Sequence, residues 1–457
     1  MSDVTSELKI AVILPHPKKV TPIHAQNHWL KSLYRRHLKP IAPLRAILIV
    51  AWRNFYPLYL MAKSRLSVDP EIRKWRRVVP FRQYVDQSNR DRIKLADAAF
   101  VATRAPSMIP RKYQSYLTPQ DGYSAPEVSI QTFTNARING GSNLLHLRDQ
   151  VVCHDLFDLP NDTTSEELHG RVLFSVPSSR IRLLQHDKDP IVLPVAATFV
   201  DACAPNYAHW LTEVLPRLAL YCAKTNFRDV PILINAGLHK NILDSLAYFV
   251  GGDREVIALS IGRAAEVNEL HATSVAGYVP FGRRQQRRPS QQRYSQGCFN
   301  PDAFERIRGV LLPAALSQSV VTSPQKFYIR RNSGTRRVVN AAELEAALIG
   351  RGYAIVEPEK LSFIEQVRVF ANAKTIIGSS GAALANMVFA AKAARIYILI
   401  GRYPDTSFWY WQNIASAVGG NIAYMLGEIQ PGGGEEIHAD FHIDVQSFLK
   451  ELDEHEN

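Results

Sequence analysis

The stretch KTIIGSSGAALANMVF, residues 374–389, combines a buried strand, a glycine-bracketed pair of serines and a helix of small residues. An apolar run ends at Gly378, and Gly381 opens the helical pattern. Glycine at such a turn either lets the helix pack closely on the strand or lets the backbone approach a ligand. These residues alone leave both interpretations open.

The chain around this stretch alternates between short strands and amphipathic helices. The strands and helices are KFYIR (326–330), NAAELEAALIGRG (340–352), YAIVE (353–357), SFIEQVRVFANA (362–373) and ARIYILIG (394–401). Capping boxes are expected at Asn340 with Glu343 and at Ser362 with Glu365. This alternation predicts an α/β, doubly wound domain of parallel strands, in which ligands bind at the carboxyl ends of the strands near the switch point.

The preceding part of the chain shows a looser β/α alternation. Strand-like runs at 170–176 and 191–200 precede NYAHWLTEVLPRLALYCAK (206–224), which has apolar residues at helical spacing. A helix with Asn300 as its cap leads to a connection near 315–325. We therefore expect three parts: a basic, largely helical extension at 1–120, an α/β domain at 121–318, and a Rossmann-like domain with the C-terminal tail at 319–457.

Composition is that of a globular protein, with 46% hydrophobic and 21% charged residues among 457. The cysteines, Cys153, Cys203, Cys222 and Cys298, show neither a C-x-x-C pair nor metal-ligand spacing. This scatter fits a reducing compartment. The first ten residues lack the basic-then-apolar pattern of a signal peptide, so we expect a cytoplasmic protein.

The net charge of +12 is concentrated near the N-terminus. Residues 1–120 hold 22 Lys and Arg against 7 Asp and Glu, with basic clusters at 31–39 and 73–77 around the apolar segment 41–63. Arg45 and Arg53 interrupt that segment, so we do not expect it to span a membrane. Contact of residues 31–77 with an anionic membrane surface and an ordinary buried helix pair are the two alternatives. We do not expect nucleic-acid binding, because no recognisable motif accompanies the charge.

Polar residues gather where the strands of the C-terminal domain end. Arg330, Arg331 and Arg337 follow the first strand, and Glu357 ends the second. The turn Gly378, Ser379, Ser380, Gly381 and Ala382 ends the third. A helix N-terminus, serine hydroxyls and arginines together suit a diphosphate, and Glu357 could hold ribose hydroxyls. The alternatives are a packing turn, salt-bridge arginines and a helix-capping glutamate.

A second group of polar residues lies on the helix expected at 206–224. His209 and Glu213 are four residues apart and share one face, which suits an oriented general base. Asp201 is a further candidate base, and Pro216 should kink the helix. A surface ion pair is the ordinary alternative for such a His–Glu pair.

The motif DKD, residues 187–189, matches the Asp-x-Asp pattern of metal–nucleotide sites. It lies between two strand-like runs, where a turn commonly uses aspartate. A basic loop at 282–293 is expected to be a solvated surface loop, although its arginines could also lie near an anion. We adopt the turn for DKD and predict no metal and no cofactor.

Together these patterns resemble glycosyltransferase family 61, through four motifs in the family's order. The first is matched by Asn206, Tyr207, His209, Trp210, Glu213, Leu215, Pro216, Arg217 and Leu218. The second is matched by Tyr328, Ile329, Arg330 or Arg331, and Arg336 with Arg337. The third is matched by Leu361, Ser362, Phe363, Glu365 and Gln366, and the last by Gly378, Gly381, Ala382, Leu384 and Asn386. The family's usual histidine in the last motif is replaced here by Ser380.

The resemblance implies a GT-B arrangement of two Rossmann-like domains facing a cleft. It implies a nucleotide-sugar donor, UDP-linked in known members, on the C-terminal domain, and a glycan or glycolipid acceptor on the N-terminal one. It also implies inverting, metal-independent transfer, in bacteria commonly for capsular or other surface polysaccharide. By this resemblance Asn386 joins the donor-binding residues, while Asn206, Trp210 and Arg217 line the acceptor cleft. Because of Ser380, a non-catalytic binding or assembly protein on the same scaffold is the alternative.

Overall fold

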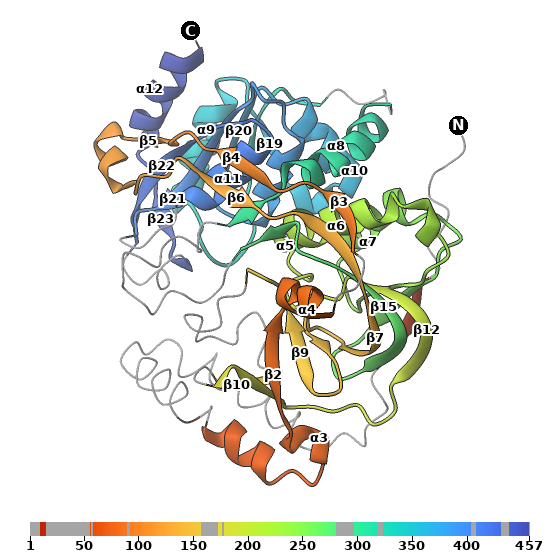
Figure 1. The fold of residues 1–457 in the computed structure, drawn as a ribbon. Helices are drawn as coiled ribbons and strands as arrows, with labels where there is room; N and C mark the ends of the chain where they lie inside the picture. Colours follow the sequence, from red (N-terminus) through yellow and green to blue (C-terminus); the bar gives the residue numbers. More distant parts are fainter. Residues whose placement is uncertain are drawn as a thin grey trace.

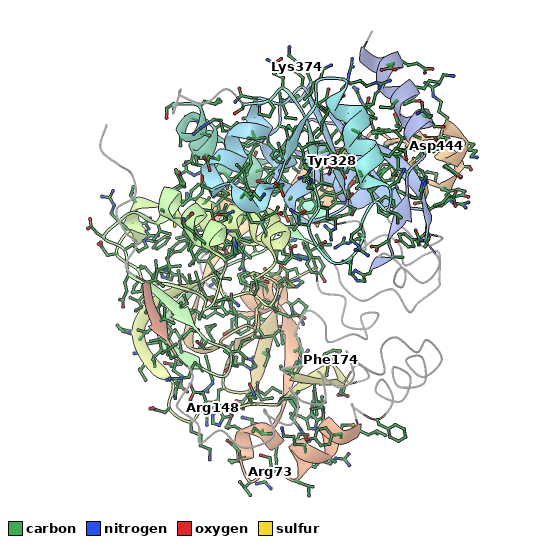
Figure 2. The ribbon with its side chains drawn as sticks, turned by 180° about the vertical axis from the view of Figure 1, so that it is seen from behind. Arg73, Arg148, Phe174, Tyr328, Lys374 and Asp444 are labelled. Atoms are coloured by element: carbon green, nitrogen blue, oxygen red, sulfur yellow. The ribbon has the colours of Figure 1, made fainter. Side chains whose placement is uncertain are left out.

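The structure is a computed structural model, and it describes residues 10–14, 55, 58–88, 92–156, 172–175, 178–279, 297–317, 323–403, 408–430 and 438–456. The basic segment 31–39, residues 41–54 of the apolar segment and the loop 282–293 lie outside the described residues. Two lobes, each built on a β-sheet, make up the described chain (Figure 1). Seen from behind, Tyr328 lies in the C-terminal lobe and Arg148 in the N-terminal lobe (Figure 2).

The C-terminal lobe has a parallel sheet in the order β19-β18-β20-β21-β22, with β5 alongside β22 and β23 antiparallel to it. The strands are β18 (Lys326–Ile329), β19 (Ala354–Val356), β20 (Thr375–Ser379), β21 (Arg395–Gly401), β22 (Ile422–Ile429), β5 (Ser107–Ile109) and β23 (Phe441–His442). In chain order the five parallel strands run 2-1-3-4-5, a doubly wound order with a switch point between the first and third strands. The predicted β/α alternation of this lobe is confirmed.

Helices cover both faces of this sheet. They are α9 (Ala341–Ile349), η8 (Pro358–Lys360), α10 (Phe363–Ala371), η9 (Ala382–Phe389), α11 (Trp409–Ala417) and α12 (Val445–Glu456). Side chains from α10 and η9 pack with Ile376 on one face, while α9 and α12 pack with Ile377 on the other. Because both faces are covered, the strands are continuously apolar, which made them easy to find in the sequence.

The N-terminal lobe contains, in the described residues, a mixed 12-stranded sheet ordered β1-β14-β13-β12-β15-β7-β8-β9-β2-β11-β10, with β3 beside β7. Its parallel part is β1 (Ile10–Ile13), β14 (Val256–Leu259), β13 (Ile232–Asn235), β12 (Ile191–Thr198) and β15 (Ala264–Thr273). The remaining strands are β7 (Val128–Asn139), β8 (Leu145–His146), β9 (Gln150–Cys153), β2 (Trp75–Pro80), β11 (Arg180–Leu183), β10 (Val172–Ser175) and β3 (Ile93–Ala96). Parallel and antiparallel pairs thus share one sheet.

The described part of residues 1–120 differs from the largely helical extension predicted for it. Its helical segments are residues 58–65, α3 (Pro70–Arg73), α4 (Phe81–Ser88) and the 3₁₀ helix η2 (Arg111–Tyr116), and it also supplies strands to both large sheets. Among them, β5 joins the C-terminal sheet as an orange strand beside the blue ones (Figure 1). A further hairpin-like pair joins β4 (Ala99–Ala102) to β6 (Gly122–Ala125). The prediction of a largely helical segment is therefore wrong for these strand-forming residues. Local patterns did not mark them as strands, because the strands that pair with them lie far away in the sequence.

Helices also connect the two lobes through one continuous apolar core. The helix expected at 206–224 is present as α5 (Tyr207–His209), the π-helical turn η4 (Trp210–Val214) and α6 (Leu215–Cys222). It packs, with α7 (Lys240–Val250) and α8 (Pro301–Leu316), against α10 and η9 of the other lobe. No helix in the described residues is long and apolar enough to cross a membrane.

The helix termini test the capping predictions. Asn300 caps α8 through the amide of Ala303 at 3.2 Å, and the box of Ser362 with Glu365 is present. The box predicted at Asn340 is wrong, because the Asn340 side chain exchanges hydrogen bonds with the backbone of Ile443 instead. A tertiary partner has therefore replaced the local one.

The DKD motif forms a turn, as predicted. Asp187 accepts hydrogen bonds from the amides of Asp189 at 3.2 Å and Ala264 at 2.9 Å, and pairs with Arg263 at 3.0 Å. Its carboxylate is therefore used to hold the turn against β15.

Candidate functional site

The candidate site begins at the switch point of the C-terminal sheet. Ile329 of β18 pairs with Gly378 of β20, so Arg330 and Arg331 leave the sheet beside Ser379 and Ser380. The prediction that these two strand ends lie on the same edge is confirmed. In a sheet of this order, that edge is where ligands ordinarily bind.

Arg331 contacts the glycine turn directly. A Cβ on Gly381 would collide with Nη1 of Arg331, so only glycine lets the guanidinium lie there. Nε of Arg331 donates to the carbonyl of Thr335 at 2.8 Å. Burial, together with the neighbouring positive charge of Arg336, lowers the pKa of Arg331 to about 10. A pKa lowered in this way means that the guanidinium would gain stabilisation from an anion at this edge.

The other polar residues predicted at this edge of the sheet form ion pairs or hydrogen bonds within the protein. Arg330 makes a bidentate pair with Glu345 at 2.9 and 2.6 Å. Arg337 pairs with Asp440 at 2.7 Å, and Glu357 accepts from Asn332 at 2.9 Å and Lys360 at 2.6 Å. The salt-bridge alternative thus describes Arg330 and Arg337 in this structure.

Ser380, which stands where the family has histidine, faces the protein interior. Its hydroxyl accepts a hydrogen bond from Nε1 of Trp411 at 3.1 Å, and its amide donates to the carbonyl of Leu399 at 2.9 Å. We expected this amide to bind a diphosphate, but the sheet already uses it. Ser379 is the buried last residue of β20, and Ala382 begins η9, which is a 3₁₀ rather than an α-helix.

The N-terminal lobe contributes a His–Glu pair at the π-helical turn. Nδ1 of His209 contacts the Glu213 carboxylate, as the four-residue spacing predicted. Burial alone would lower the pKa of His209, because it disfavours the imidazolium. The carboxylates of Glu213 and Asp201 have the larger, opposite effect, so the pKa of His209 is raised. Burial also raises the pKa of Glu213. A buried imidazole oriented by a carboxylate is suited to take a proton from a bound hydroxyl.

The π-turn follows from Pro216, which has no amide to donate within the helix. The amide of Leu215 reaches back to the carbonyl of Trp210, which widens the turn that carries Glu213. Gly277 lies so close to the carbonyl of Thr212 that a Cβ there would collide with it. The structure thus shows a π-helical turn just before Pro216, and the kink stays a prediction.

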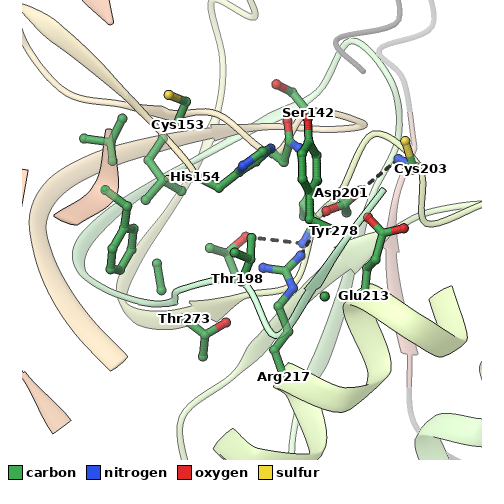
Figure 3. A pocket seen from close by; sticks show the side chains of 18 of the residues that line it. Ser142, Cys153, His154, Thr198, Asp201, Cys203, Glu213, Arg217, Thr273 and Tyr278 are labelled. Carbon is green, nitrogen blue, oxygen red and sulfur yellow. Dashed lines mark hydrogen bonds and ion pairs between the residues drawn. The ribbon is translucent and has the colours of Figure 1, made fainter. Parts of the chain in front are cut away.

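A pocket of mixed polar and apolar lining opens beside Glu213 in the N-terminal lobe, and His209 is not among its lining residues (Figure 3). Asp201, Glu213 and Arg217 line it, and Arg217 pairs with Asp201 at 3.1 Å. His154 lines another wall, with its ring 4.5 Å from that of Tyr278. Burial lowers the pKa of His154 to about 4; Asp201 opposes this shift and Arg217 adds to it. His154 was not among the residues predicted from the sequence; it directly follows β9.

Two predicted acceptor residues have structural positions instead. Asn206 caps α5 by accepting from the amide of Ala208 at 3.0 Å. Trp210 is fully buried and donates to Ser245 at 2.9 Å. Of the three predicted cleft residues, only Arg217 lines the pocket.

A chain of buried hydrogen bonds joins the two lobes. The hydroxyl of Tyr207 donates to Oδ1 of Asn386 at 2.7 Å, and Nδ2 of Asn386 donates to Oε1 of Gln366 at 3.0 Å. Gln366 in turn donates to the carbonyl of Pro358 at 3.0 Å. Asn386, predicted to bind the donor, therefore links the helix of His209 to the segment that follows Glu357.

Tyr410 of α11 packs against Trp411, with the ring centroids 4.5 Å apart. Burial is the main reason that its pKa is raised, and Glu213 and Arg336 both act on it electrostatically. The structure therefore describes a two-lobed α/β protein, with the His–Glu pair in the N-terminal lobe and Arg331 beside the glycine turn of the C-terminal lobe.

Comparison with known families agrees with this class. Residues 207–397 match the family model described as Glycosyltransferase 61, which is less than half of the chain. The matched range holds the His–Glu pair, Arg331 and the glycine turn. It supports the resemblance to glycosyltransferase family 61. No curated protein matches the chain.

Proposed function

We propose that this protein is an inverting glycosyltransferase. It transfers a sugar from a nucleotide donor, UDP-linked, to a hydroxyl of a glycan or glycolipid in surface or capsular polysaccharide synthesis. The donor binds the C-terminal lobe and the acceptor the N-terminal lobe, in a GT-B arrangement within the cytoplasm. The observation that carries the proposal is the buried link Tyr207–Asn386, which holds the helix of His209 against the turn that carries Gly381.

The acceptor hydroxyl loses its proton to His209. Because Glu213 contacts Nδ1, the proton is taken at Nε2, and Glu213 stabilises the imidazolium that forms. The acceptor oxygen then attacks the anomeric carbon as the bond to the diphosphate breaks. Asp201, held by Arg217, adds negative charge near the imidazolium and is the alternative base.

The leaving diphosphate gains negative charge at the other lobe. Arg331 is the group best suited to stabilise it, because burial has already removed much of its hydration and Gly381 leaves its guanidinium accessible to the edge. We propose that no metal takes part in this step.

The proposal is tested with a panel of nucleotide sugars, following transfer to oligosaccharide acceptors and the anomeric configuration of the product. His209→Ala should abolish transfer while UDP affinity is unchanged. His442→Ala is the control, because His442 is exposed on β23. Full transfer by His209→Ala would refute the assignment of the base.

A second candidate is a non-catalytic binding or assembly protein on the same scaffold. It is favoured by Ser380, whose hydroxyl accepts from Trp411 and so differs from the family's histidine. Calorimetry with UDP, CMP and GDP separates the two, because this candidate predicts no affinity for any diphosphate.

A further inference from the structure

A short helix lies at the tip of the N-terminal lobe, with the half-buried Leu60 and Met61 and the buried Ser64 on its inward side. It covers residues 58–65, and Ser64 on it is 1% exposed. The Ser64 hydroxyl accepts from Nη1 of Arg182 at 3.1 Å and donates to the carbonyl of Met61 at 2.9 Å. The guanidinium of Arg182 also lies 4.5 Å from the ring of Trp75. The helix is thus fixed to β11 and β2 through a polar contact.

Large apolar side chains are also exposed on the outward side of the helix and next to its ends. Phe55 is 70% exposed, Leu58 59%, Tyr59 56%, Leu66 83% and Val68 90%. Leu58 and Tyr59 lie on the side of the helix away from Ser64, whereas Leu66 and Val68 follow its end. A helix on a soluble surface ordinarily turns its large apolar side chains toward the core, and a contiguous exposed apolar patch indicates a binding surface.

Positive charge surrounds this apolar face. Lys63 and Arg65 are exposed on either side of it, and Arg73 is exposed at the end of the neighbouring α3 (Figure 2). The carboxylates nearby are paired. Asp69 contacts His186 at 2.9 Å, Asp149 contacts Lys74 at 3.0 Å, and Glu71 pairs with Arg76. The tip therefore presents apolar side chains with a basic border.

We propose that this tip surface, formed by Phe55, Leu58, Tyr59, Lys63, Arg65, Leu66, Val68 and Arg73, docks on an anionic lipid surface. The apolar side chains enter the boundary between headgroups and acyl chains, and the basic side chains contact the headgroups. Nucleic acid fits less well, because its phosphates would leave the apolar face exposed to water. The inference does not depend on sugar transfer, since it concerns another face of the molecule.

The test is co-sedimentation of the full chain with vesicles of phosphatidylcholine mixed with phosphatidylglycerol, and with vesicles of phosphatidylcholine alone. The unchanged protein should sediment with the anionic vesicles only, and added salt should weaken its binding. The double variant Leu58→Glu, Leu66→Glu should bind about tenfold or more weakly, because it loses two apolar contacts and adds two negative charges.

The matched control is Val339→Glu, Ile349→Glu. These two apolar residues are also exposed, at 48% and 57%, but lie in the C-terminal lobe. The control carries the same change of charge and should bind vesicles as the unchanged protein does. Equal binding by the tip variant, or no binding of the unchanged protein to anionic vesicles, would overturn the proposal. So would a dimer that the tip variant converts to monomer without any vesicle binding, since a second copy would then cover the surface.

Discussion

Replacement of Tyr207 by phenylalanine tests whether the two lobes are held in register for catalysis. The Tyr207 hydroxyl donates to Asn386 at 2.7 Å, and burial raises its pKa, so it remains a neutral donor. The variant keeps the ring and removes only the oxygen. Tyr207 lies two residues before His209, and Asn386 lies in η9 directly after the glycine turn. We therefore treat Tyr207 as a positioning residue.

The size of the effect follows from what is left behind. Asn386 is fully buried, so Oδ1 loses its donor without access to water, which costs about 1–3 kcal/mol of unfolding free energy. Tyr221→Phe is a matched control. Its hydroxyl, also buried, contacts Nδ1 of His271 at 2.8 Å within the N-terminal lobe. Both variants should lose similar stability.

Only Tyr207→Phe should also slow transfer. A misplacement of about 1 Å between reacting groups can cost roughly a hundredfold in rate, so we expect kcat to fall about 10- to 100-fold. Affinity for UDP, measured by calorimetry, should be unchanged. Denaturant unfolding gives the stability of each variant. Equal kcat losses in Tyr207→Phe and Tyr221→Phe, or unchanged kcat in the former, would refute a positioning role.

Three further predictions concern the site. In the proposed mechanism the neutral form of His209 is the base, and the pKa of His209 is raised, so the transfer rate should rise as pH increases above about 6.5. Glu213→Gln should move this rise to lower pH, and an unmoved profile would contradict the pairing. Arg331→Ala should weaken UDP binding in calorimetry by about 10- to 100-fold, whereas Arg330→Ala should change it little because Glu345 holds that side chain. Ser380→His should lower the unfolding free energy by about 1–3 kcal/mol, because the larger side chain must fit a buried position against Trp411. Tighter UDP binding by this variant would contradict the conclusion that Ser380 faces the protein interior.

The features that sequence could predict depend on local patterns. The strands of the C-terminal sheet are short apolar runs next to turn residues, and the helix of His209 has regular apolar spacing. The shared edge of Arg331 and Gly381 followed from the rule that parallel strands end on one side of a sheet. The contact of His209 with Glu213 needed only the helical period.

The features that sequence could not predict depend on partners far away in the chain. Strand β5 pairs with β22 across more than 300 residues, and nothing within Ser107–Ile109 indicates that partner. The cap expected at Asn340 was lost to Ile443 for the same reason. His154 reaches the pocket only because β9 lies in the same sheet as β12, which precedes Asp201.

The glycine turn shows that the packing and ligand interpretations were not exclusive. Gly378 serves packing, since a Cβ there would lie 3.1 Å from the side chain of Ile329. Gly381 instead leaves room for the guanidinium of Arg331, a polar group at the ligand-binding edge. Although Ser380 replaces the family's histidine, Arg331 still supplies positive charge at this edge. In the proposed function Arg331 binds the donor diphosphate, and calorimetry of the unchanged protein with UDP separates the transferase from the non-catalytic scaffold.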